Sequence, residues 1–303
     1  MSEARATALE TIWLEVPEIA VELFEAALST ACTSIGFFLD ESTGRWRIEG
    51  VRQPGHNDAA LGAGIAVAQA ITGFVPALNR VPIPAQGWLA RTRNSFPEQL
   101  VGRRIAVRGT HIAKARAAGR VTVTLDAEIA FGSGEHGSTR GCLRALEKRI
   151  AARRPRRILD LGSGSGILAI AAAKLLRRKV LAVDIDPRAV HVARRNAARN
   201  GVRGLMRVAV SDGWRSRTVR RGAPYDLVFA NILARPLCTM AKQARIAPGG
   251  RLVLSGLLQT QARMVLAAYR PQGLYLEATI REGNWATLIV RRASPLQPMR
   301  KDG

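Results

Sequence analysis

The sequence lacks any apolar run that approaches the roughly 18 residues needed to cross a bilayer. Its N-terminus, MSEARATALE, also lacks the basic start and apolar stretch that are typical of a secretory signal. We therefore expect a soluble, cytoplasmic protein with no membrane contact.

Cysteine and histidine are scarce and scattered. The cysteines form no C-x-x-C pair, and the histidines show none of the short spacings of a metal-binding helix. This pattern argues against both a disulfide framework and a zinc site, so we predict buried free thiols and no metal. The residues concerned are Cys32, Cys142, Cys238, His56, His111, His136 and His191.

Lysine is rare as well: it accounts for six of the 46 basic residues in a chain of net charge +23. A basic surface favours a nucleic-acid or ribosome-associated partner, including a weak contact with RNA. An excess of arginine beside abundant alanine can equally reflect the coding bias of a genome.

The charge is unevenly distributed along the chain. Residues 1–43 contain eight acidic residues and one arginine, a net charge of −7 that leaves +30 on the rest of the chain. This asymmetry predicts a separate N-terminal module with its own partner.

The first part of the chain has the pattern of a small α+β domain. Alternating apolar residues predict strands at 10–16, 36–40 and 45–51, with helices at 17–29 and 58–72 and a connection at 75–88. On the first helix, Ile19, Leu23, Phe24 and Ala27 share the apolar face, and a stripe of Glu18, Glu22 and Glu25 faces solvent or a partner. We predict a domain over 1–75, a linker over 76–102 and a second domain over 103–303.

From residue 103 onward, apolar strands alternate with helical segments, which predicts a mostly parallel sheet with crossover helices. We expect strands at 156–161, 179–184, 206–210, 226–230 and 251–255, and helices at 140–150, 166–177, 187–200, 233–246 and 259–270. Two final strands, LYLEATI and WATLIVRR, are joined by a tight polar turn and predict an antiparallel hairpin. The fold class is therefore α/β, a doubly wound, mostly parallel seven-stranded sheet with a C-terminal hairpin, an arrangement typical of methyltransferases.

The segment RRILDLGSGSGILAIAAAKL reads as a buried strand, a glycine-rich loop and a helix. Asp160 ends the strand, and Gly162, Gly164 and Gly166 remove side chains where a ligand must approach the backbone. The following helix N-terminus favours a carboxylate. Glycines alone also serve tight turns, but the strand before and the helix after favour a ligand site.

Asp184 ends the next strand, KVLAVDID, where a carboxylate can accept hydrogen bonds from two ribose hydroxyls. Asp186 precedes Pro187 and is better explained as a helix N-cap. Nicotinamide-binding folds use G-x-G-x-x-G, whereas the D-x-G-x-G-x-G of this chain is similar to that of S-adenosylmethionine enzymes. We therefore expect S-adenosyl-L-methionine as the cofactor.

Asn231 ends the strand in PYDLVFANILARPL and has both an acceptor and a donor with which to hold a target amine. We expect it to orient that amine for catalysis, with a helix cap as the alternative. The loop AFGSGEHGSTR at 130–140 can fold over a bound ligand. Within it, Ser138 or Thr139 also suits the N-cap of the following helix.

Together, AFGSGEHGST, ILDLGSGSGILAIAAAKL, AVDIDPRAVHVARRNAARNGV, DLVFANILARPL and PGGRLVLSGLL resemble the PrmA-type ribosomal protein methyltransferases. The resemblance is dense over 126–270. The family's loop pattern is matched at Phe131, Gly132, Gly134, His136 and Thr139, with Gly137 in place of the usual proline.

The resemblance implies cofactor contacts at Thr139, Gly162, Asp184 and Asn231. It also implies transfer of methyl groups to lysine and N-terminal amines of a large-subunit ribosomal protein, with the N-terminal domain recognising that substrate. Two alternatives remain open: an RNA methyltransferase and a non-catalytic ribosome assembly factor. Asn231 is followed by Ile-Leu-Ala rather than by an aromatic run on which a nucleobase would stack, which disfavours the former. The intact glycine loop, Asp184 and Asn231 disfavour the latter.

Overall fold

The structure is a computed structural model of the chain and describes residues 9–32, 34–40, 42–83, 98–110, 112, 119–125, 137–150 and 154–293. The chain divides into two compact units, Met1–Asn94 and Ser95–Gly303. None of the helices in the described ranges is long and apolar enough to span a membrane.

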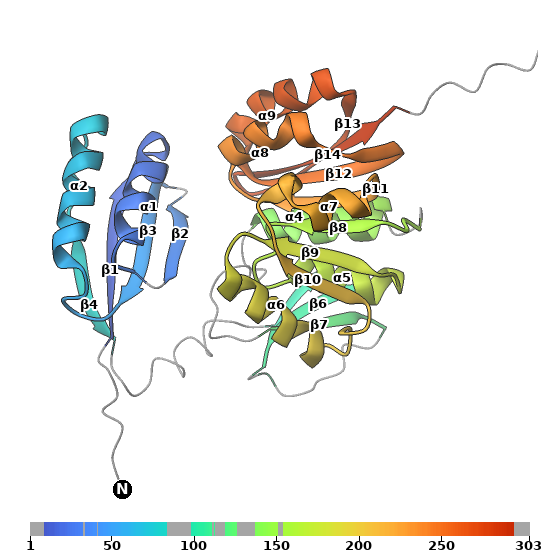
Figure 1. The fold of residues 1–303 in the computed structure, drawn as a ribbon, viewed down its shortest axis with the longest axis horizontal. Coiled ribbons are helices and arrows are strands. Elements are labelled where there is room, and N and C mark those ends of the chain that lie inside the picture. Colours follow the sequence, from blue (N-terminus) through green and yellow to red (C-terminus); the bar gives the residue numbers. More distant parts are fainter. Residues whose placement is uncertain are drawn as a thin grey trace, which may run out of the picture. The chain divides into compact units, whose positions relative to one another are not determined.

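The first unit is an antiparallel sheet in the order β2-β3-β1-β4 (Figure 1). Its elements are β1 (Leu9–Val16), η1 (Glu18–Ala20), α1 (Val21–Ser29), β2 (Ser34–Asp40), β3 (Arg45–Arg52), α2 (Asp58–Thr72) and β4 (Asn79–Ile83). The helices come close because Gly64 of α2 faces Ala27 of α1, where a Cβ on the glycine would lie 3.0 Å from the Cα of Ala27.

Residues 79–83 form strand β4, which pairs with β1, and are not the connection that the sequence predicted.

Two details of this unit differ from the sequence analysis. Ile19 is 73% exposed, so it does not share the buried face of Phe24 and Leu28. The stripe of glutamates is also not uniformly solvent-facing: Glu22 is exposed, whereas Glu25 is half-buried, and burial together with the charge of Glu22 raises the pKa of Glu25.

The second unit contains a seven-stranded sheet in the order β10-β9-β8-β11-β12-β14-β13 (Figure 1). The strands β8 to β12 run parallel, and β13 and β14 form the predicted antiparallel hairpin. The strands are β8 (Ile158–Leu161), β9 (Val180–Asp184), β10 (Met206–Val210), β11 (Tyr225–Asn231), β12 (Ile246–Leu258), β13 (Leu274–Glu282) and β14 (Trp285–Arg292). The predicted fold class is confirmed.

Helices connect these strands across both faces of the sheet. They are α4 (Gly137–Ala145), η2 (Leu146–Ile150), α5 (Ile167–Leu176), α6 (Pro187–Arg199), η4 (Gly213–Arg215), α7 (Arg217–Gly222), α8 (Ala234–Met240), η5 (Ala241–Gln243), η6 (Gln259–Gln261), α9 (Ala262–Tyr269) and η7 (Arg270–Gln272). The helix expected at 233–246 is shorter, because β12 already begins at Ile246.

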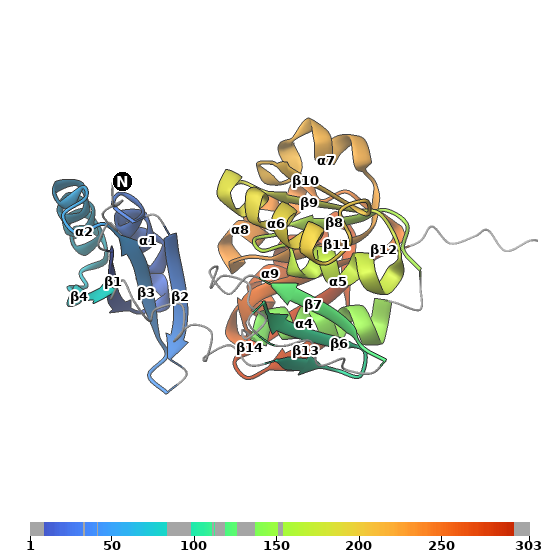
Figure 2. The same cartoon turned by 90° about the horizontal axis from the view of Figure 1, so that it is seen from below.

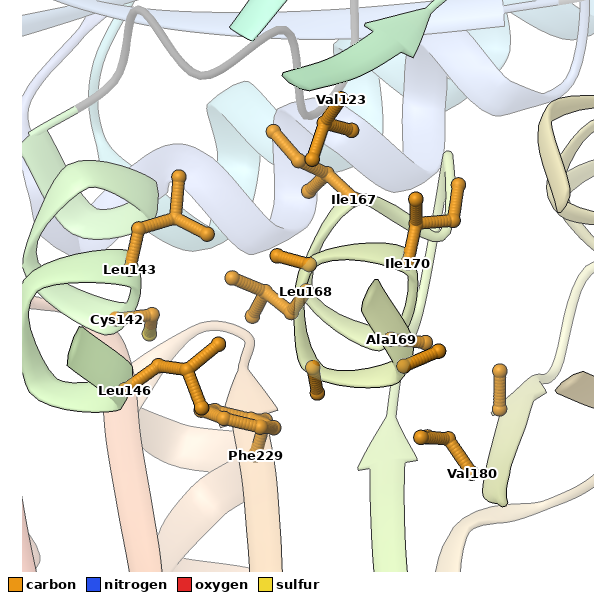
Figure 3. Close-up of a cluster of buried hydrophobic side chains, with 14 of the residues drawn as sticks. Val123, Cys142, Leu143, Leu146, Ile167, Leu168, Ala169, Ile170, Val180 and Phe229 are labelled. Carbon is orange, nitrogen blue, oxygen red and sulfur yellow. The ribbon is translucent and has the colours of Figure 1, made fainter. Parts of the chain in front are cut away.

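Each face of the sheet has its own apolar core, because side chains alternate along each strand. Leu227 and Phe229 of β11 pack with α4, α5 and α6, whereas Val228 and Ala230 pack with α7, α8 and α9. Figure 3 shows Phe229 beside Leu146 and Leu168 in the first of these cores. This is the two-sided burial that a doubly wound fold requires.

A small sheet in the order β5-β6-β7 covers the outer side of α5 (Figure 2). Its strands are β5 (Gln99–Val101), β6 (Ile105–Gly109) and β7 (Val121–Leu125). Residues 167–173 of α5 are all buried, as expected for a helix that is apolar on every side.

The three cysteines are free thiols, but only Cys142 is fully buried. Cys32 and Cys238 are half-buried, which corrects the prediction of buried thiols.

We predict that Gly256→Ala destabilises the second unit more than Gly201→Ala does. Both glycines have a left-handed backbone, with φ of +80° and +69°, so each alanine costs about 1–2 kcal/mol. Gly256 lies at an irregularity in the pairing of β12, and its Cβ would also lie 2.5 Å from the carbonyl oxygen of Ile232. That clash adds about 1–3 kcal/mol. Urea denaturation checks the ranking, and equal losses in the two variants would contradict it.

Candidate functional site

The candidate site lies at the carboxyl ends of β8 and β11, where the order of the strands reverses. β8 pairs with β9 on one side and with β11 on the other, although β9 and β10 come between β8 and β11 in the chain. In open α/β sheets such a switch point opens a crevice that binds ligands. Asp160, Asp184 and Asn231 all lie at this edge (Figure 1 shows the three strands).

The glycine-rich loop after β8 depends on the absence of side chains. Gly162, Gly164 and Gly166 have φ of +71°, +50° and +81°. A Cβ on Gly162 would lie 2.5 Å from Cγ2 of Ile232, whereas one on Gly164 would meet nothing within 4 Å. The loop thus packs tightly on one side and leaves its backbone accessible at Gly164, as close approach by a ligand requires.

Asp184 ties this loop to the end of β9. Its Oδ2 accepts a hydrogen bond of 2.8 Å from the backbone N–H of Gly164, and its Oδ1 accepts one of 3.1 Å from that of Asp186. A carboxylate has about four lone-pair sites, so Asp184 keeps acceptor capacity for a ligand. The side chain of Asp186 accepts a hydrogen bond from the N–H of Arg188 at the start of α6, which confirms that it is an N-cap.

Asp160 is almost completely buried at the end of β8. Its Oδ2 accepts a hydrogen bond of 2.9 Å from the backbone N–H of Ala169, in the first turn of α5. Burial, and secondarily the charge of Asp184, raises the pKa of Asp160 to about 7. Its Oδ1 has no hydrogen-bond partner among the described residues. Asp160 is therefore a carboxylate that would gain from a nearby cation.

Asn231 ends β11 and contacts α4. Its Nδ2 donates a hydrogen bond of 3.2 Å to Oγ1 of Thr139, and its buried Oδ1 has no partner in the described part of the chain. The next helix, α8, begins at Ala234 with Leu233 as its N-cap, so Asn231 is not a helix cap. The Nδ2 group of its amide is therefore held by Thr139, and its Oδ1 can accept a hydrogen bond from a ligand.

Thr139 reaches Asn231 because α4 is fixed against the sheet. The helix begins at Gly137, so Ser138 and Thr139 lie inside its first turn and do not precede it as caps. Oγ of Ser255 donates a hydrogen bond of 3.0 Å to the carbonyl oxygen of Ser138. It also shares a hydrogen bond of 2.7 Å with Oγ1 of Thr287. This buried hydroxyl pair was not predicted.

One signal in the sequence pointed to this close packing: two glycines lie four residues apart in α4. A Cβ on Gly137 would lie 2.7 Å from the carbonyl oxygen of Glu282, and one on Gly141 would lie 2.1 Å from Oγ1 of Thr287. Both glycines therefore let α4 approach the hairpin.

The rest of the predicted ligand loop, residues 130–136 with His136, lies outside the described residues.

Three buried oxygen atoms of the site have no hydrogen-bond partner among the described residues: Oδ1 of Asp160, Oγ of Ser163 and Oδ1 of Asn231. Buried polar atoms without partners are rare in folded proteins and call for an explanation, such as a bound ligand. The arrangement suits a ligand that carries hydrogen-bond donors and positive charge. The described residues contain no group of three or more histidine, cysteine or acidic side chains that could hold a metal ion.

Comparison with known proteins agrees with this geometry. Residues 65–293 match the family described as "Ribosomal protein L11 methyltransferase (PrmA)". A protein named ribosomal protein L11 methyltransferase from Caulobacter sp. (strain K31) is 39% identical over 255 residues, 84% of this chain and 85% of its own length. The protein of the same name from Rhizobium meliloti (strain 1021) is 43% identical over 217 residues, 71% of this chain and 74% of its own length.

A solved structure leads to the same family. The crystal structure of ribosomal protein L11 methylase from Lactobacillus delbrueckii subsp. bulgaricus aligns with a TM-score of 0.55 at 27% identity, over 64% of this chain and 96% of that one. The resemblance seen in the sequence motifs is confirmed by both the extent of the family match and the identity to its members. The chain therefore belongs to the ribosomal protein L11 methyltransferase (PrmA) family.

Proposed function

We propose that this chain transfers methyl groups from S-adenosyl-L-methionine to lysine and N-terminal amines of ribosomal protein L11, in the cytoplasm. The observation that carries the proposal is the position of Asn231. Its side chain is anchored on Thr139 and has a free acceptor next to a glycine-rich loop that suits a ligand. The names of the relatives support the choice of substrate.

The residues at the carboxyl edge suit each part of this cofactor. Asp184 would accept the ribose hydroxyls, and Gly162, Gly164 and Gly166 would let the backbone approach. Asp160, with its unpartnered oxygen, and Thr139 would face the amino-acid end. When bound, the cofactor supplies a methyl group on a positively charged sulfur, which a neutral amine can attack.

Asn231 would contribute by orienting the acceptor amine. Its Oδ1 would accept an N–H of the amine, which leaves the nitrogen lone pair directed at the methyl group. The hydrogen bond from Nδ2 to Thr139 fixes which end of the amide faces the substrate. Positioning of this kind lowers the barrier because the orientation is set before the reaction.

We propose the N-terminal unit, residues 1–75 together with β4 (Asn79–Ile83), as the substrate-recognition domain and residues 103–303 as the methyltransferase domain. Residues 1–43 carry a charge of −7, and opposite charge would accelerate encounter with a basic ribosomal protein. The +30 on the rest of the chain favours, in addition, a weak contact with RNA.

Asp184→Ala should weaken cofactor binding by about 1.5–3 kcal/mol, the range for losing charge-assisted hydrogen bonds. Isothermal titration calorimetry of the folded variant measures the change. Asp186→Ala is the matched control: it removes an adjacent carboxylate that caps α6, so it should cost about 0.5–2 kcal/mol of stability and leave cofactor affinity intact. Unchanged affinity in Asp184→Ala would remove this residue from the site.

Asn231→Ala should lower the rate of methylation about 10²-fold and affect cofactor affinity much less, because its proposed role is to orient the amine. Single-turnover methylation of purified L11 with labelled cofactor measures the rate and also tests the proposed substrate. Thr139→Val, which removes the anchor but keeps Asn231, should show a smaller loss. A wild-type rate in Asn231→Ala would refute the orienting role.

Asp160 should make the cofactor-free protein less stable as pH rises. Its pKa is about 7 in the folded state and about 3.9 when unfolded, so the folded state binds the proton more tightly. That stabilisation is complete below about pH 4 and is lost as pH rises through about 7. Asp160→Asn should therefore gain stability relative to the wild type between these pH values in chemical denaturation. Bound cofactor, being cationic, should shrink the difference. Parallel stability profiles for the two proteins would contradict the assignment.

A further inference from the structure

Basic side chains gather at the amino-terminal edge of the parallel sheet, opposite the candidate site. They occupy the segments that lead into β8, β9, β10, β11 and β12. All are exposed, and we call them the basic edge: Arg154, Arg156, Arg157, Arg177, Arg178, Lys179, Arg203, Arg220, Arg221 and Arg245.

The backbone places these segments side by side. The N–H of Asp226 donates to the carbonyl oxygen of Arg157 at 2.9 Å, and that of Tyr225 to Arg245 at 2.9 Å. The N–H of Val180, next to Lys179, donates to Leu205 at 2.8 Å. Adjacent strands lie about 4.8 Å apart, so the basic edge extends about 19 Å across the five parallel strands in Figure 1.

The carboxylates of the described residues do not neutralise the charge of the basic edge. No ion pair joins any of its ten side chains to a carboxylate in the described ranges. Asp226, near the start of β11, uses its Oδ2 to accept hydrogen bonds from the backbone N–H groups of Arg156 and Arg157, at 2.8 and 2.9 Å. A compact row of positive charge therefore faces solvent.

Stabilisation of helix ends explains only part of this row. Cations favour helix C-termini, which accounts for Arg177, Arg220 and Arg221 after or within the last turns of α5 and α7. It does not account for Arg156 or Arg203, which precede strands. Arg177 also has φ of +53°, a left-handed conformation that glycine adopts at far lower cost. The fold itself gives no reason for arginine there.

We infer that the basic edge binds the phosphate backbone of RNA. Arginine pairs with phosphate through two parallel hydrogen bonds, and a nucleic acid presents phosphates in a regular line that a linear row of charge can follow. The segments of the basic edge contain no aromatic residue, so base stacking is absent and binding is independent of sequence. The large exposed apolar residues of the described chain lie outside these segments, which disfavours insertion into a membrane.

This contact is separate from methyl transfer, because the cofactor site lies at the carboxyl ends of the same strands. RNA bound at the basic edge therefore leaves the candidate site open to a protein substrate. The inference does not depend on which amine is methylated.

The test measures binding of a fluorescent 20-nucleotide polyuridylate to the full chain across a range of salt concentrations. Arg178→Ala/Arg203→Ala should weaken binding about tenfold at low salt. It should also reduce the slope of log K against log salt by about 1.4, since each phosphate contact on a single strand contributes about 0.7. The matched control, Arg217→Ala/Arg263→Ala, removes two exposed arginines that begin helices after the carboxyl ends of β10 and β12, and it should keep the wild-type slope.

A second variant guards against misfolding. Arg177→Gly relieves the strain of a left-handed backbone at a non-glycine residue and also removes a charge, so Tm should hold or rise as RNA affinity falls.

Equal losses of RNA affinity in the basic-edge and control variants would overturn the inference. Binding of poly-glutamate or of phosphatidylserine vesicles as tight as that of RNA would also overturn it. Loss of cofactor affinity in Arg178→Ala/Arg203→Ala would overturn the separation of the two edges. If the wild-type chain binds RNA as described but does not methylate L11, only the proposed function fails.

Discussion

The backbone after β8 touches the residue that follows β11, and the site depends on this contact. Gly162 and Ile232 lie so close that a single Cβ on the glycine would reach 2.5 Å from the isoleucine methyl group. The parallel register of β8 and β11 pairs Asp160 with Phe229 and Leu161 with Ala230, and so brings the two chain segments to the same height. Because no side chain separates them, Asp160, the loop and Asn231 lie together at the switch point of the sheet, the place where folds of this kind bind ligands.

Small polar residues fix the position of α4 beside this edge of the sheet. Ser255 and Thr287 lie on adjacent strands of the sheet, and their hydroxyl groups share a hydrogen bond; Oγ of Ser255 donates a second one to the carbonyl oxygen of Ser138, all in the buried interior. A buried hydroxyl left unpaired costs about 1–3 kcal/mol, so the three groups hold one arrangement. That arrangement sets α4 at the height where Thr139 meets Asn231. The position of the Asn231 amide thus depends on Ser255, which is its partner in the parallel register of β11 and β12.

The two edges of the parallel sheet carry different side chains. The carboxyl edge gathers Asp160 and Asp184 around the glycine loop, and burial keeps the pKa of Asp160 high. The amino edge gathers the ten cationic side chains of the basic edge. A parallel sheet separates its strand ends by the full length of the strands, so the proposed cofactor and the proposed RNA would have separate surfaces on the same domain.

The sequence by itself determined the alternation of strands and helices over residues 156–270, the C-terminal hairpin, the role of Asp186 as a cap and the presence of a glycine-rich turn between β8 and α5, because periodicity, turn chemistry and caps act over a few residues. The match of the motifs to the family likewise needed no coordinates. Only the tertiary structure decided that β4 joins the N-terminal sheet, that Ile19 is exposed and that Asn231 bonds Thr139 and caps no helix. These features, like the hydrogen bond between Ser255 and Ser138, join residues up to 117 positions apart or depend on which face of an element contacts a neighbour. Such long-range contacts are set by the packing of the whole sheet and leave no local pattern in the chain.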